Sequence, residues 1–490
     1  MGLGGDSAAR SALCLAGRVL NDVLSFLVFS FLDLLDVFLC LVYKLIDYAV
    51  EAEWKPCYCS SAKDMITSSG KILVSESGGS KVVCLFSSKL LLEDISDTLY
   101  SRPSLVSEVS MSTVRELRRL KTERASRMVV VARTSPGAAA VRSAASGATT
   151  TTFTINSTIV EMLQGRIGGL QSLPVPRWSD CDCRTCTSWS SSTKDSLFVR
   201  AEGPKGEGAK EDVLFIHGFI SSSLFWTETV FPNLSEETKS RYRLIAVDLL
   251  GFGRSPKPTD SLYTLREHVD MIERSVLEPF KVSRFHIVAH SLGCILALAL
   301  AVKYPGAVKS LTLLAPPYFP VPKGQQGSQF VLRKVAPRRV WPPITFGASV
   351  ACWYEHISRT VCLLICKNHR VWEFAFKQIT RNRMRTFLMD GFFCHTHNAA
   401  WHTLHNIICG SAGKMDGYLD VVRDQLGCDV TVFHGSDDEL LPVECTLAVK
   451  SRIPRAHLKV VDGKDHITIV VGRQKAFAAE LEEIWTRATG

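Results

Sequence analysis

Cysteine is scarce and charge is nearly balanced in this chain of 490 residues. Its 16 cysteines are about 3% of the sequence, well below the content of a disulfide-stabilised scaffold. No internal repeat of solenoid length is visible, which excludes a repeat architecture. Lys and Arg number 57 against 48 Asp and Glu, and much of this small excess comes from one stretch. The composition therefore gives no reason to expect nucleic acid as a partner.

Apolar and aromatic residues, in contrast, are plentiful. Hydrophobic residues make up 46% of the chain, which contains 24 Phe, 9 Trp and 10 Tyr. This content rules out a wholly disordered protein. The length suits one large domain with additional segments. We expect a mostly globular protein, an enzyme, with an unusual N-terminal segment.

Residues 23–42 are nearly all Leu, Val and Phe, and Asp33 and Asp36 interrupt them. The run is long enough to span a bilayer. Transfer of its apolar residues into a bilayer would be favourable by roughly 5–9 kcal/mol of free energy. Transfer of two central carboxylates would be unfavourable by about 2.5–3.5 kcal/mol each. Because these sums nearly cancel, composition alone does not establish simple spanning.

On a helix, the polar residues of this segment fall on one narrow stripe. The stripe consists of Arg18, Asp22, Ser25, Asp33, Asp36, Cys40, Lys44 and Asp47. Such a helix lies in or on lipid and turns its stripe toward protein, another helix or water. The alternative is a long secretory signal that is cleaved near residues 45–50. Residues 1–50 are therefore predicted to be a hydrophobic signal or membrane segment, and the protein to be membrane-associated or secreted.

Residues 51–195 have the composition of an irregular extension. Apolar runs within residues 51–110 predict short strands and helices. Residues 115–133 are basic in a helical pattern, which favours a solvated face over attachment to anionic lipid. Residues 134–152 are mostly Ala, Gly, Ser and Thr, and they are predicted to be a linker because they have few large side chains to bury.

Three cysteines near the end of this extension form a C-x-C-x-x-C pattern. They are Cys181, Cys183 and Cys186, with Cys57 and Cys59 far upstream. Zinc usually takes four ligands in paired C-x-x-C spacings, so this pattern is a weak indication of metal. Disulfides are the alternative if the segment lies in the secretory pathway. Glycosylation triplets at Asn156 and Asn233 are compatible with that compartment.

From residue 196 onward, apolar runs alternate with helical patterns. Strands are predicted at 196–202, 212–217, 243–248, 285–289, 310–315, 429–434 and 457–462, and helices near 264–278, 292–304, 443–451 and 472–488. Continuously apolar strands with helices between them indicate an α/β fold, with a mostly parallel sheet covered on both faces. Residues 317–426 contain no such strand and are predicted to be a helical insertion between core segments 196–316 and 427–490.

The string Ala289-His-Ser-Leu-Gly293 follows an apolar strand and opens an apolar helix. A nucleophilic serine needs a sharp strand-to-helix turn that projects its Oγ above the sheet. The turn crowds the positions two before and two after Ser291, and Ala289 and Gly293 are both small. The N–H of Leu292 then points toward a developing oxyanion. This pattern predicts Ser291 as a nucleophile.

A second oxyanion donor is predicted in the loop after an earlier strand. His217-Gly218-Phe219 follows Val213-Leu-Phe-Ile216. Gly218 permits close backbone approach, so Phe219 N–H is the expected donor. His217 is expected to hold the loop by hydrogen bonding rather than to act as a base.

A nucleophilic serine needs a base and a carboxylate that orients the base. A strand ending at His434 leads to Asp437 and Asp438, and the next predicted strand leads to His466. Strand ends of such a sheet gather at one edge. The order Ser291, Asp438, His466 is the order of this architecture and predicts a catalytic triad.

With these motifs the chain resembles the α/β-hydrolase superfamily over residues 196–490. The family pattern G-x-x-D-x-x-x-P matches Gly435, Asp438 and Pro442, which favours Asp438 over Asp437 as the acid. The string Asp248-Leu-Leu-Gly-Phe-Gly-Arg-Ser255 matches the family's D-x-x-G-x-G-x-S turn. This match implies that Arg254 and Ser255 fix the loop beneath the site.

A closer resemblance, over nearly the whole chain, is to the BODYGUARD group of plant α/β-hydrolases. It rests on the hydrophobic N-terminus and on four strings of residues. These are His217-Gly-Phe-Ile, Ala289-His-Ser-Leu-Gly, His395-Thr-His-Asn-Ala-Ala-Trp-His402 and Lys464-Asp-His-Ile-Thr-Ile-Val-Val-Gly472. The resemblance implies an epidermal protein of the cell envelope or cell wall that promotes cuticle formation and is classed as a probable lysophospholipase.

The insertion supplies two further groups of polar residues. One group lies near Trp401 and consists of His395, His397, His402 and His405; the other consists of Arg381, Arg383 and Arg385. The spacing of His402 and His405 suits a metal, but no nearby Asp or Cys pair completes a zinc site, so packing and pocket lining are favoured. For the arginines, a solvated face is favoured over binding of a phosphate or carboxylate head group.

Together these features predict a serine hydrolase for lipid-type acyl esters, without metal or other cofactor. Apolar helices above the catalytic edge form a lid, which suits an acyl chain better than a sugar or peptide. Two alternatives remain open. An acyltransferase would use the same triad to build polyester from hydroxy-fatty acids, and a receptor-like hydrolase would bind a small lipid and signal through its lid.

Overall fold

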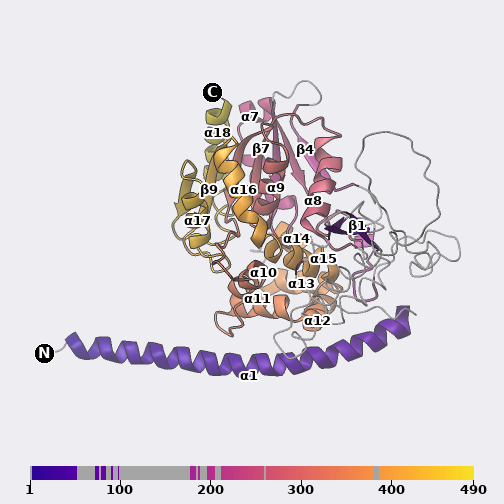
Figure 1. Cartoon of the computed structure of the whole chain (residues 1–490), viewed down its shortest axis with the longest axis vertical. Helices are drawn as coiled ribbons and strands as arrows, with labels where there is room; N and C mark the ends of the chain where they lie inside the picture. Colours follow the sequence, from indigo (N-terminus) through magenta and orange to yellow (C-terminus); the bar gives the residue numbers. More distant parts are fainter. Residues whose placement is uncertain are drawn as a thin grey trace, which may run out of the picture.

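A seven-stranded sheet forms the centre of the computed structural model (Figure 1). The structure describes residues 3–51, 72–76, 79–83, 90–91, 96, 98, 177–183, 186–187, 196–204, 211–258, 261–379 and 386–489. The sheet has the strand order β10-β9-β8-β7-β5-β6-β4. Its strands are β4 (Val199–Glu202), β5 (Glu211–Ile216), β6 (Tyr242–Val247), β7 (Phe285–His290), β8 (Val308–Leu314), β9 (Asp429–Gly435) and β10 (His457–Val461).

All neighbouring strands in this sheet are parallel except β4 and β6, which pair antiparallel at one edge. The central strands β5 and β7 are buried almost throughout, whereas every residue of the edge strands β4 and β10 is half-buried or exposed. All seven strands predicted from the sequence are present, with ends shifted by a few residues. The continuous apolar runs were informative because both faces of a central parallel strand are covered.

Helices cover both faces of the sheet. They are α6 (Leu224–Thr227), η4 (Phe231–Asn233), α7 (Glu236–Arg241), α8 (Leu265–Ile272), η5 (Glu273–Leu277), α9 (Leu292–Lys303), α17 (Glu444–Arg452) and α18 (Gln474–Thr489). One buried cluster unites side chains of α8, α9 and α17, and a second unites those of α6, η4 and α18. Helix α8 begins at Leu265 because Thr264 and Glu267 form a reciprocal capping box.

Between β8 and β9 the chain forms the helical insertion. Its elements are α10 (Gly327–Val335), α11 (Pro343–Trp353), α12 (Glu355–Ile365), α13 (His369–Ile379), α14 (Thr386–Phe393), α15 (His397–Thr403), η6 (Leu404–Cys409) and α16 (Ala412–Asp424). A small separate sheet comprises β1 (Ile72–Glu76), β2 (Gly79–Val83) and β3 (Leu90–Leu91). The predicted basic helix, the linker, Asn156, Cys57, Cys59 and the three arginines at 381–385 lie outside the described residues.

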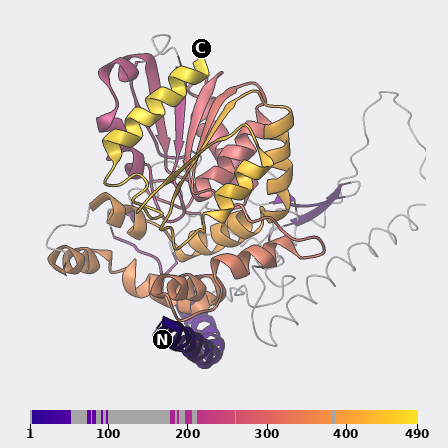
Figure 2. The ribbon, with the colours of Figure 1, turned by 90° about the vertical axis from the view of Figure 1, so that its left-hand side faces the viewer.

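The N-terminal segment is one long helix, α1 (Leu3–Glu51), of 49 residues. It runs along the outer side of the insertion, away from the sheet (Figure 1), and Figure 2 shows it end-on below the insertion helices. Residues 16–47 are long and apolar enough to cross a membrane by length and composition. Side chains of Phe26, Phe31 and Leu34 are 63–74% exposed.

The polar stripe of α1 faces the insertion along the part of the helix that lies against it. The Asp33 carboxylate accepts hydrogen bonds from Arg338 at 3.0 Å and from the Tyr354 hydroxyl at 2.8 Å. The Asp36 carboxylate accepts from the backbone N–H of His356 at 2.9 Å. The prediction that the stripe turns toward protein is therefore confirmed for these residues. Nearer the N-terminus, Arg18 and Asp22 are exposed.

Asp47 joins the end of α1 to two other parts of the chain. Its carboxylate accepts hydrogen bonds from Arg359 at 2.7 and 2.8 Å, from Arg177 at 2.7 Å and from the Trp178 indole at 2.6 Å. Asp47 and Arg359 are both buried. Buried charges in this arrangement are stable only while each has its partner, so α1 and the insertion are electrostatically linked.

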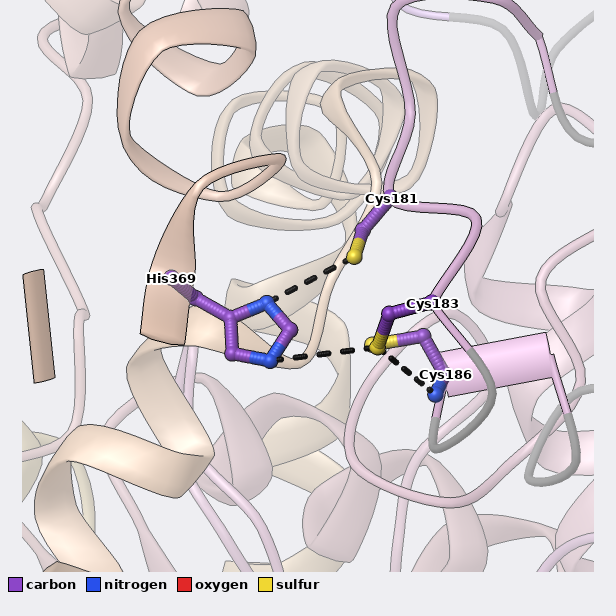
Figure 3. Close-up of side chains that lie close together, drawn as sticks. All are labelled: Cys181, Cys183, Cys186 and His369. Atoms are coloured by element: carbon purple, nitrogen blue, oxygen red, sulfur yellow. Dashed lines mark hydrogen bonds between the residues drawn. The ribbon is translucent and has the colours of Figure 1, made fainter. Parts of the chain in front are cut away.

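The segment 177–187 lies at this junction. Arg359 Nε donates to Ser179 Oγ at 3.0 Å, and Lys367 donates to the carbonyl of Trp178. Three cysteines of the segment gather beside a histidine of α13 (Figure 3): Cys181, Cys183, Cys186 and His369. All twelve cysteines that the structure describes are free thiols, so the alternative of disulfides at these three is not observed.

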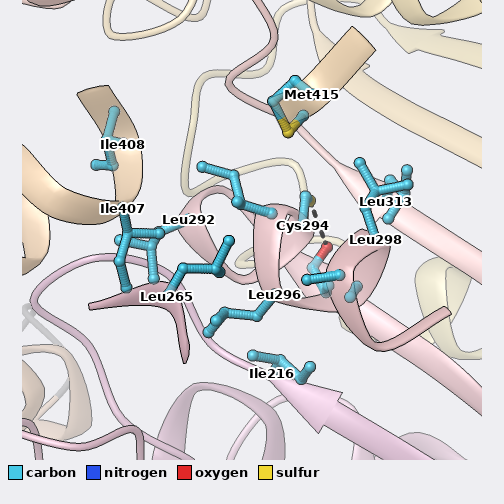
Figure 4. Close-up of a cluster of buried hydrophobic side chains, with 14 of the residues drawn as sticks. Ile216, Leu265, Leu292, Cys294, Leu296, Leu298, Leu313, Ile407, Ile408 and Met415 are labelled. Carbon is cyan, nitrogen blue, oxygen red and sulfur yellow. Dashed lines mark hydrogen bonds between the residues drawn. The ribbon is translucent and has the colours of Figure 1, made fainter. Parts of the chain in front are cut away.

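Helix α9 lies in the larger apolar cluster, directly behind the sheet edge that carries the site. Its own Leu296 lies among buried side chains of other elements, which include Ile216, Leu313 and Met415 (Figure 4). Nearly every residue of α9 is buried, because it packs between the sheet and the helices η6 and α16. The position of the helix N-terminus is thus fixed by packing on all sides.

We predict that Asp47→Ala destabilises the protein by about 3 kcal/mol, because it leaves Arg359 buried without its partner. Urea unfolding of the full chain in detergent measures the change. Asp22→Ala is the matched control, since Asp22 lies exposed on the same helix and its loss is expected to cost little. Equal effects of the two substitutions would contradict the role assigned to Asp47.

The contact of α1 with His356 predicts a pH dependence. Burial opposes protonation of His356, but Glu355 and Asp36 outweigh burial and raise its pKa to about 9 from 6.5. A raised pKa in the folded state stabilises the protein below pH 6.5, and this contribution is lost as the pH rises through about 9. We expect His356→Gln to flatten the decline of unfolding free energy over this range by about 3 kcal/mol. An unchanged decline in the variant would argue against the assignment.

Candidate active site

Ser291 occupies a strained turn between β7 and α9. Its backbone angles are φ 52° and ψ −120°, in a region that side-chain-bearing residues rarely adopt. The turn is held by the hydrogen bond from Ser291 N–H to the carbonyl of Leu314 at 2.8 Å. A Cβ on Gly293 would lie 2.7 Å from the carbonyl oxygen of Ile216, so only glycine lets α9 approach β5 this closely.

Two backbone N–H groups flank Ser291. Leu292 is the first residue of α9, where helix geometry leaves N–H groups without an intrahelical acceptor. The loop of Phe219 reaches the serine because a Cβ on Gly218 would lie 3.2 Å from Ser291 Cβ. Within the part of the chain that the structure describes, the N–H groups of Phe219 and Leu292 have no acceptor.

His466 and Asp438 form a hydrogen-bonded pair near the serine. The distance from His466 Nδ1 to Asp438 Oδ2 is 2.7 Å, and the Asp438 side chain is only 1% exposed. Burial alone would raise the pKa of Asp438, but His466 and the N–H of Leu441 hold it below its usual value. Asp438 therefore stays ionised. Asp437 is exposed and accepts a hydrogen bond from Ser436 Oγ instead.

Glycine also brings the His466 loop to the strand that carries the acid. A Cβ on Gly435 would lie 2.2 Å from the carbonyl oxygen of Lys464. The N–H of Asp437 donates to the same carbonyl at 2.9 Å. The two loops consequently touch at the end of β9, which is what brings His466 within reach of Asp438.

His290 connects the serine turn with the His466 loop. Its Nε2 lies 2.9 Å from the carbonyl oxygen of His466, and the two imidazole rings are 4.7 Å apart. Burial, followed by repulsion from His466, lowers the pKa of His290 to about 3. The ring is therefore neutral and donates through Nε2. No hydrogen bond joins the Ser291 hydroxyl directly to the His466 ring among the described residues.

Two further neutral histidines hold the neighbouring loops. His217 Nε2 accepts from Leu249 N–H at 2.9 Å, and His434 Nε2 donates to the Leu441 carbonyl at 2.9 Å. Burial lowers the pKa of both rings. Sequence reasoning gave His217 this role but missed His290 and His434. The sequence could have indicated both histidines, because they lie at the ends of β7 and β9, beside the predicted site residues.

The loop after β6 supports the site from below. Both carboxylate oxygens of Asp248 accept backbone N–H groups, from Ser223 at 2.6 Å and from Arg254 at 2.8 Å. Ser255 Oγ donates to the Asp248 carbonyl at 2.5 Å and accepts from Phe198 N–H. The D-x-x-G-x-G-x-S string thus forms a closed network that fixes this loop.

The insertion covers the site. A Cβ on Gly391 would lie 3.3 Å from Ser221 Cα, so α14 packs directly on the loop that contains Phe219. A β-bridge joins Phe252 to His395. Ser291 is only 7% exposed beneath these elements.

The four histidines of the insertion do not meet in one place. His402 Nδ1 lies 2.8 Å from the Asn398 carbonyl, and His405 Nδ1 lies 2.9 Å from Thr98 Oγ1, both fully buried. His397 packs against Trp401. His395 instead lies beside Cys362 of α12 and Cys366, which directly follows that helix.

The arrangement at the sheet edge has the parts that acyl transfer through a serine requires. A hydroxyl sits on a strained turn beside two unoccupied N–H donors, and an ionised carboxylate orients a nearby imidazole. No metal is needed for such chemistry.

Comparison with known proteins agrees with this architecture. The model of the α/β hydrolase fold family matches residues 213–472. The chain is 59% identical to "Probable lysophospholipase BODYGUARD 3" of Arabidopsis thaliana, over 97% of this chain and 98% of that protein. It is 56% identical to "Probable lysophospholipase BODYGUARD 1" of the same plant, over 96% of this chain and 97% of that protein.

More distant similarities cover just over half of the chain. A 2-hydroxymuconate semialdehyde hydrolase of Pseudomonas sp. (strain CF600) is 27% identical over 53% of this chain and 82% of that protein. Among solved structures, a thermophilic esterase from Thermogutta terrifontis is 18% identical with a TM-score of 0.38, over 60% of this chain and 93% of that chain. The chain belongs to the α/β-hydrolase family and, within it, to the BODYGUARD group that its motifs indicated.

Proposed function

We propose that this protein is a serine hydrolase that cleaves acyl esters of lipid type, with Ser291, Asp438 and His466 as its catalytic triad. His466 removes the proton of Ser291, whose Oγ attacks the ester carbonyl and forms an acyl-enzyme. The N–H groups of Phe219 and Leu292 stabilise the oxyanion. His466 returns its proton to the leaving alcohol, and water then releases the acid.

The observation that carries the proposal is the 2.7 Å hydrogen bond between His466 and Asp438 at the sheet edge that holds Ser291. An ionised Asp438 favours the imidazolium that forms when Ser291 is deprotonated. His290 acts as a positioning residue, because its bond to the His466 carbonyl ties the base to the serine turn. In this mechanism, side-chain rotation in the substrate complex brings Ser291 Oγ into hydrogen-bond distance of the His466 ring.

The character of the insertion and of α1 supports a lipid substrate. On α13 the side chains of Val371, Phe374 and Ile379 are 67–76% exposed, and Trp341 in the α10–α11 loop is 67% exposed. Together with the outward face of α1, these residues form an apolar exterior beside the cover of the site. Substrates that partition into membranes would be concentrated there. The names of the BODYGUARD relatives point to lysophospholipids as one such class.

Helix α1 is proposed to be retained and to lie in the plane of a membrane surface. Removal of α1 would leave Arg338, His356 and Arg359 without the carboxylates that they contact. Such a loss is costly for buried charges, which disfavours a cleaved signal. The protein is accordingly proposed to act at a membrane or cell-wall face, and the group resemblance makes cuticle formation its proposed physiological role.

We expect Ser291→Ala to abolish fluorophosphonate labelling and to lower the rate of lysophospholipid hydrolysis by about 10⁶-fold, because the nucleophile is lost. Purified full-length protein and a panel of lipid esters provide the measurement. Ser240→Ala is the matched control, since Ser240 is an exposed serine on α7. Undiminished hydrolysis by the Ser291 variant would exclude the proposed mechanism.

The same assay separates the alternatives. Added hydroxy-fatty acid will yield an ester product if the protein is an acyltransferase, and only free acid if it is a hydrolase. Biological rescue by Ser291→Ala would instead favour the receptor-like role, since binding needs no nucleophile.

The exposed face of α1 predicts membrane binding. Phe26→Ser combined with Leu34→Ser should weaken flotation with phosphatidylcholine vesicles by about tenfold, because two exposed apolar side chains are lost. Leu447→Ser, which changes a 48% exposed residue on α17, is the control and should float like the wild type. Equal flotation of all three proteins would contradict this orientation.

A further inference from the structure

Four side chains with metal-binding atoms meet at the junction of the segment 177–187 and the insertion, in what we term the Cys3His cluster. Its members are Cys181, Cys183, Cys186 and His369, and their ligand atoms all lie within 4.8 Å of one another. Figure 3 shows the three sulfurs grouped around the imidazole edge. Cys181 Sγ lies 3.5 Å from one ring nitrogen of His369, and Cys183 Sγ lies 4.0 Å from the other.

These separations suit a tetrahedral ion. Zinc–sulfur bonds of about 2.3 Å and a zinc–nitrogen bond of about 2.0 Å place tetrahedral ligands roughly 3.5–3.8 Å apart. The 4.0 Å between Cys183 Sγ and His369 Nε2, and the limit of 4.8 Å for all four ligand atoms, lie slightly above that range, so side-chain rotations that draw the four atoms together would enclose an ion. Each of the four residues is partly exposed, so an ion can reach the cluster from solvent.

The local backbone positions the ligands. The N–H of Cys186 points at Cys183 Sγ at a distance of 3.5 Å, so the backbone holds these two cysteines side by side. His369 Nδ1 lies 3.0 Å from the Cys366 carbonyl oxygen. When that nitrogen donates to the carbonyl, Nε2 is left free to bind, and such an outer hydrogen bond is typical of histidines that bind zinc.

We propose that the Cys3His cluster binds one Zn²⁺ ion in a closed, structural site. Three thiolates and one imidazole are a common ligand set of structural zinc, and four protein ligands leave no position for a substrate. The ion would be separate from the site of Ser291 and would take no part in hydrolysis. The C-x-C-x-x-C pattern gave only three ligands, because His369 is far away in sequence and is brought to them by the insertion.

The proposed ion would join two parts of the chain that already meet through buried polar contacts. The segment 177–187 reaches Asp47 of α1 through Arg177 and Trp178, and it reaches α12 through Arg359. Zinc at the other end of this segment would fix it to the start of α13. The ion would thus hold together α1, the segment and the cover of the site.

A second group of side chains with metal-binding atoms lies in the insertion. Cys362, Cys366 and His395 also lie within 4.8 Å of one another, and His395 Nε2 lies 3.8 Å from Cys362 Sγ. This group offers three ligands rather than four. The proposal therefore concerns the Cys3His cluster alone, and the experiment separates the two groups.

Metal analysis of the purified full-length chain tests the proposal. After reduction and incubation with zinc chloride, mass spectrometry of the metal content should give about one tightly held zinc ion per chain. Cys183→Ser and His369→Ala should each reduce it to background. Cys362→Ser and Cys428→Ser should leave it unchanged, since Cys362 belongs to the other group and Cys428 is a buried cysteine that belongs to neither. Ser291→Ala should also retain the ion, which makes this outcome independent of the proposed hydrolase activity.

Cobalt substitution provides a readout that needs no variant. Co²⁺ in the wild-type chain should show the visible bands of a tetrahedral site and the ultraviolet charge-transfer bands of thiolate ligands, and zinc should displace it. A strong chelator should lower the unfolding temperature of the zinc-loaded protein. Absence of zinc and cobalt binding, retention of zinc by Cys183→Ser, or a disulfide between Cys181 and Cys186 would each overturn the proposal.

Discussion

The close approach of three loops at one edge of the sheet is the constraint on which the site depends. Three of the close approaches occur at glycines, where no side chain is present. Gly218 lies against the serine turn, Gly293 lets α9 approach β5, and Gly435 lies against the His466 loop. A methyl group at any of them would overlap a neighbour. The loops would then separate, and the groups proposed for catalysis would no longer face one another.

Neutral histidines hold these loops in place. His217, His290 and His434 stand at or just beyond the ends of β5, β7 and β9, and each bonds to a backbone group of an adjacent loop. Burial keeps all three uncharged, so each ring has one donor and one acceptor nitrogen. A neutral ring with one donor and one acceptor orients a loop by hydrogen bonding and adds no charge beside Asp438 and His466.

Helix α1 is held against the insertion by ion pairs and hydrogen bonds, not by apolar packing alone. Helix α1 presents carboxylates to the insertion and apolar side chains outward. A helix with this division of its surface is suited to lie between protein and lipid. The segment 177–187 adds further contacts at the same place, and the proposed zinc ion would strengthen them. The cover of the site would thus be attached to the helix that we propose to lie at a membrane surface, and the proposal connects access to Ser291 with that surface.

Sequence alone determined the seven strands, the helical insertion and the polar stripe of α1, because each depends on local periodicity of apolar residues. It also placed Ser291, Asp438 and His466 at strand ends, since short motifs report local turns. Tertiary structure decided which distant residues meet: His290 with His466, Asp47 with Arg359, and His369 with the three cysteines. Such pairings depend on how the insertion folds back on α1 and on the sheet, and no local pattern encodes a contact between segments more than 150 residues apart.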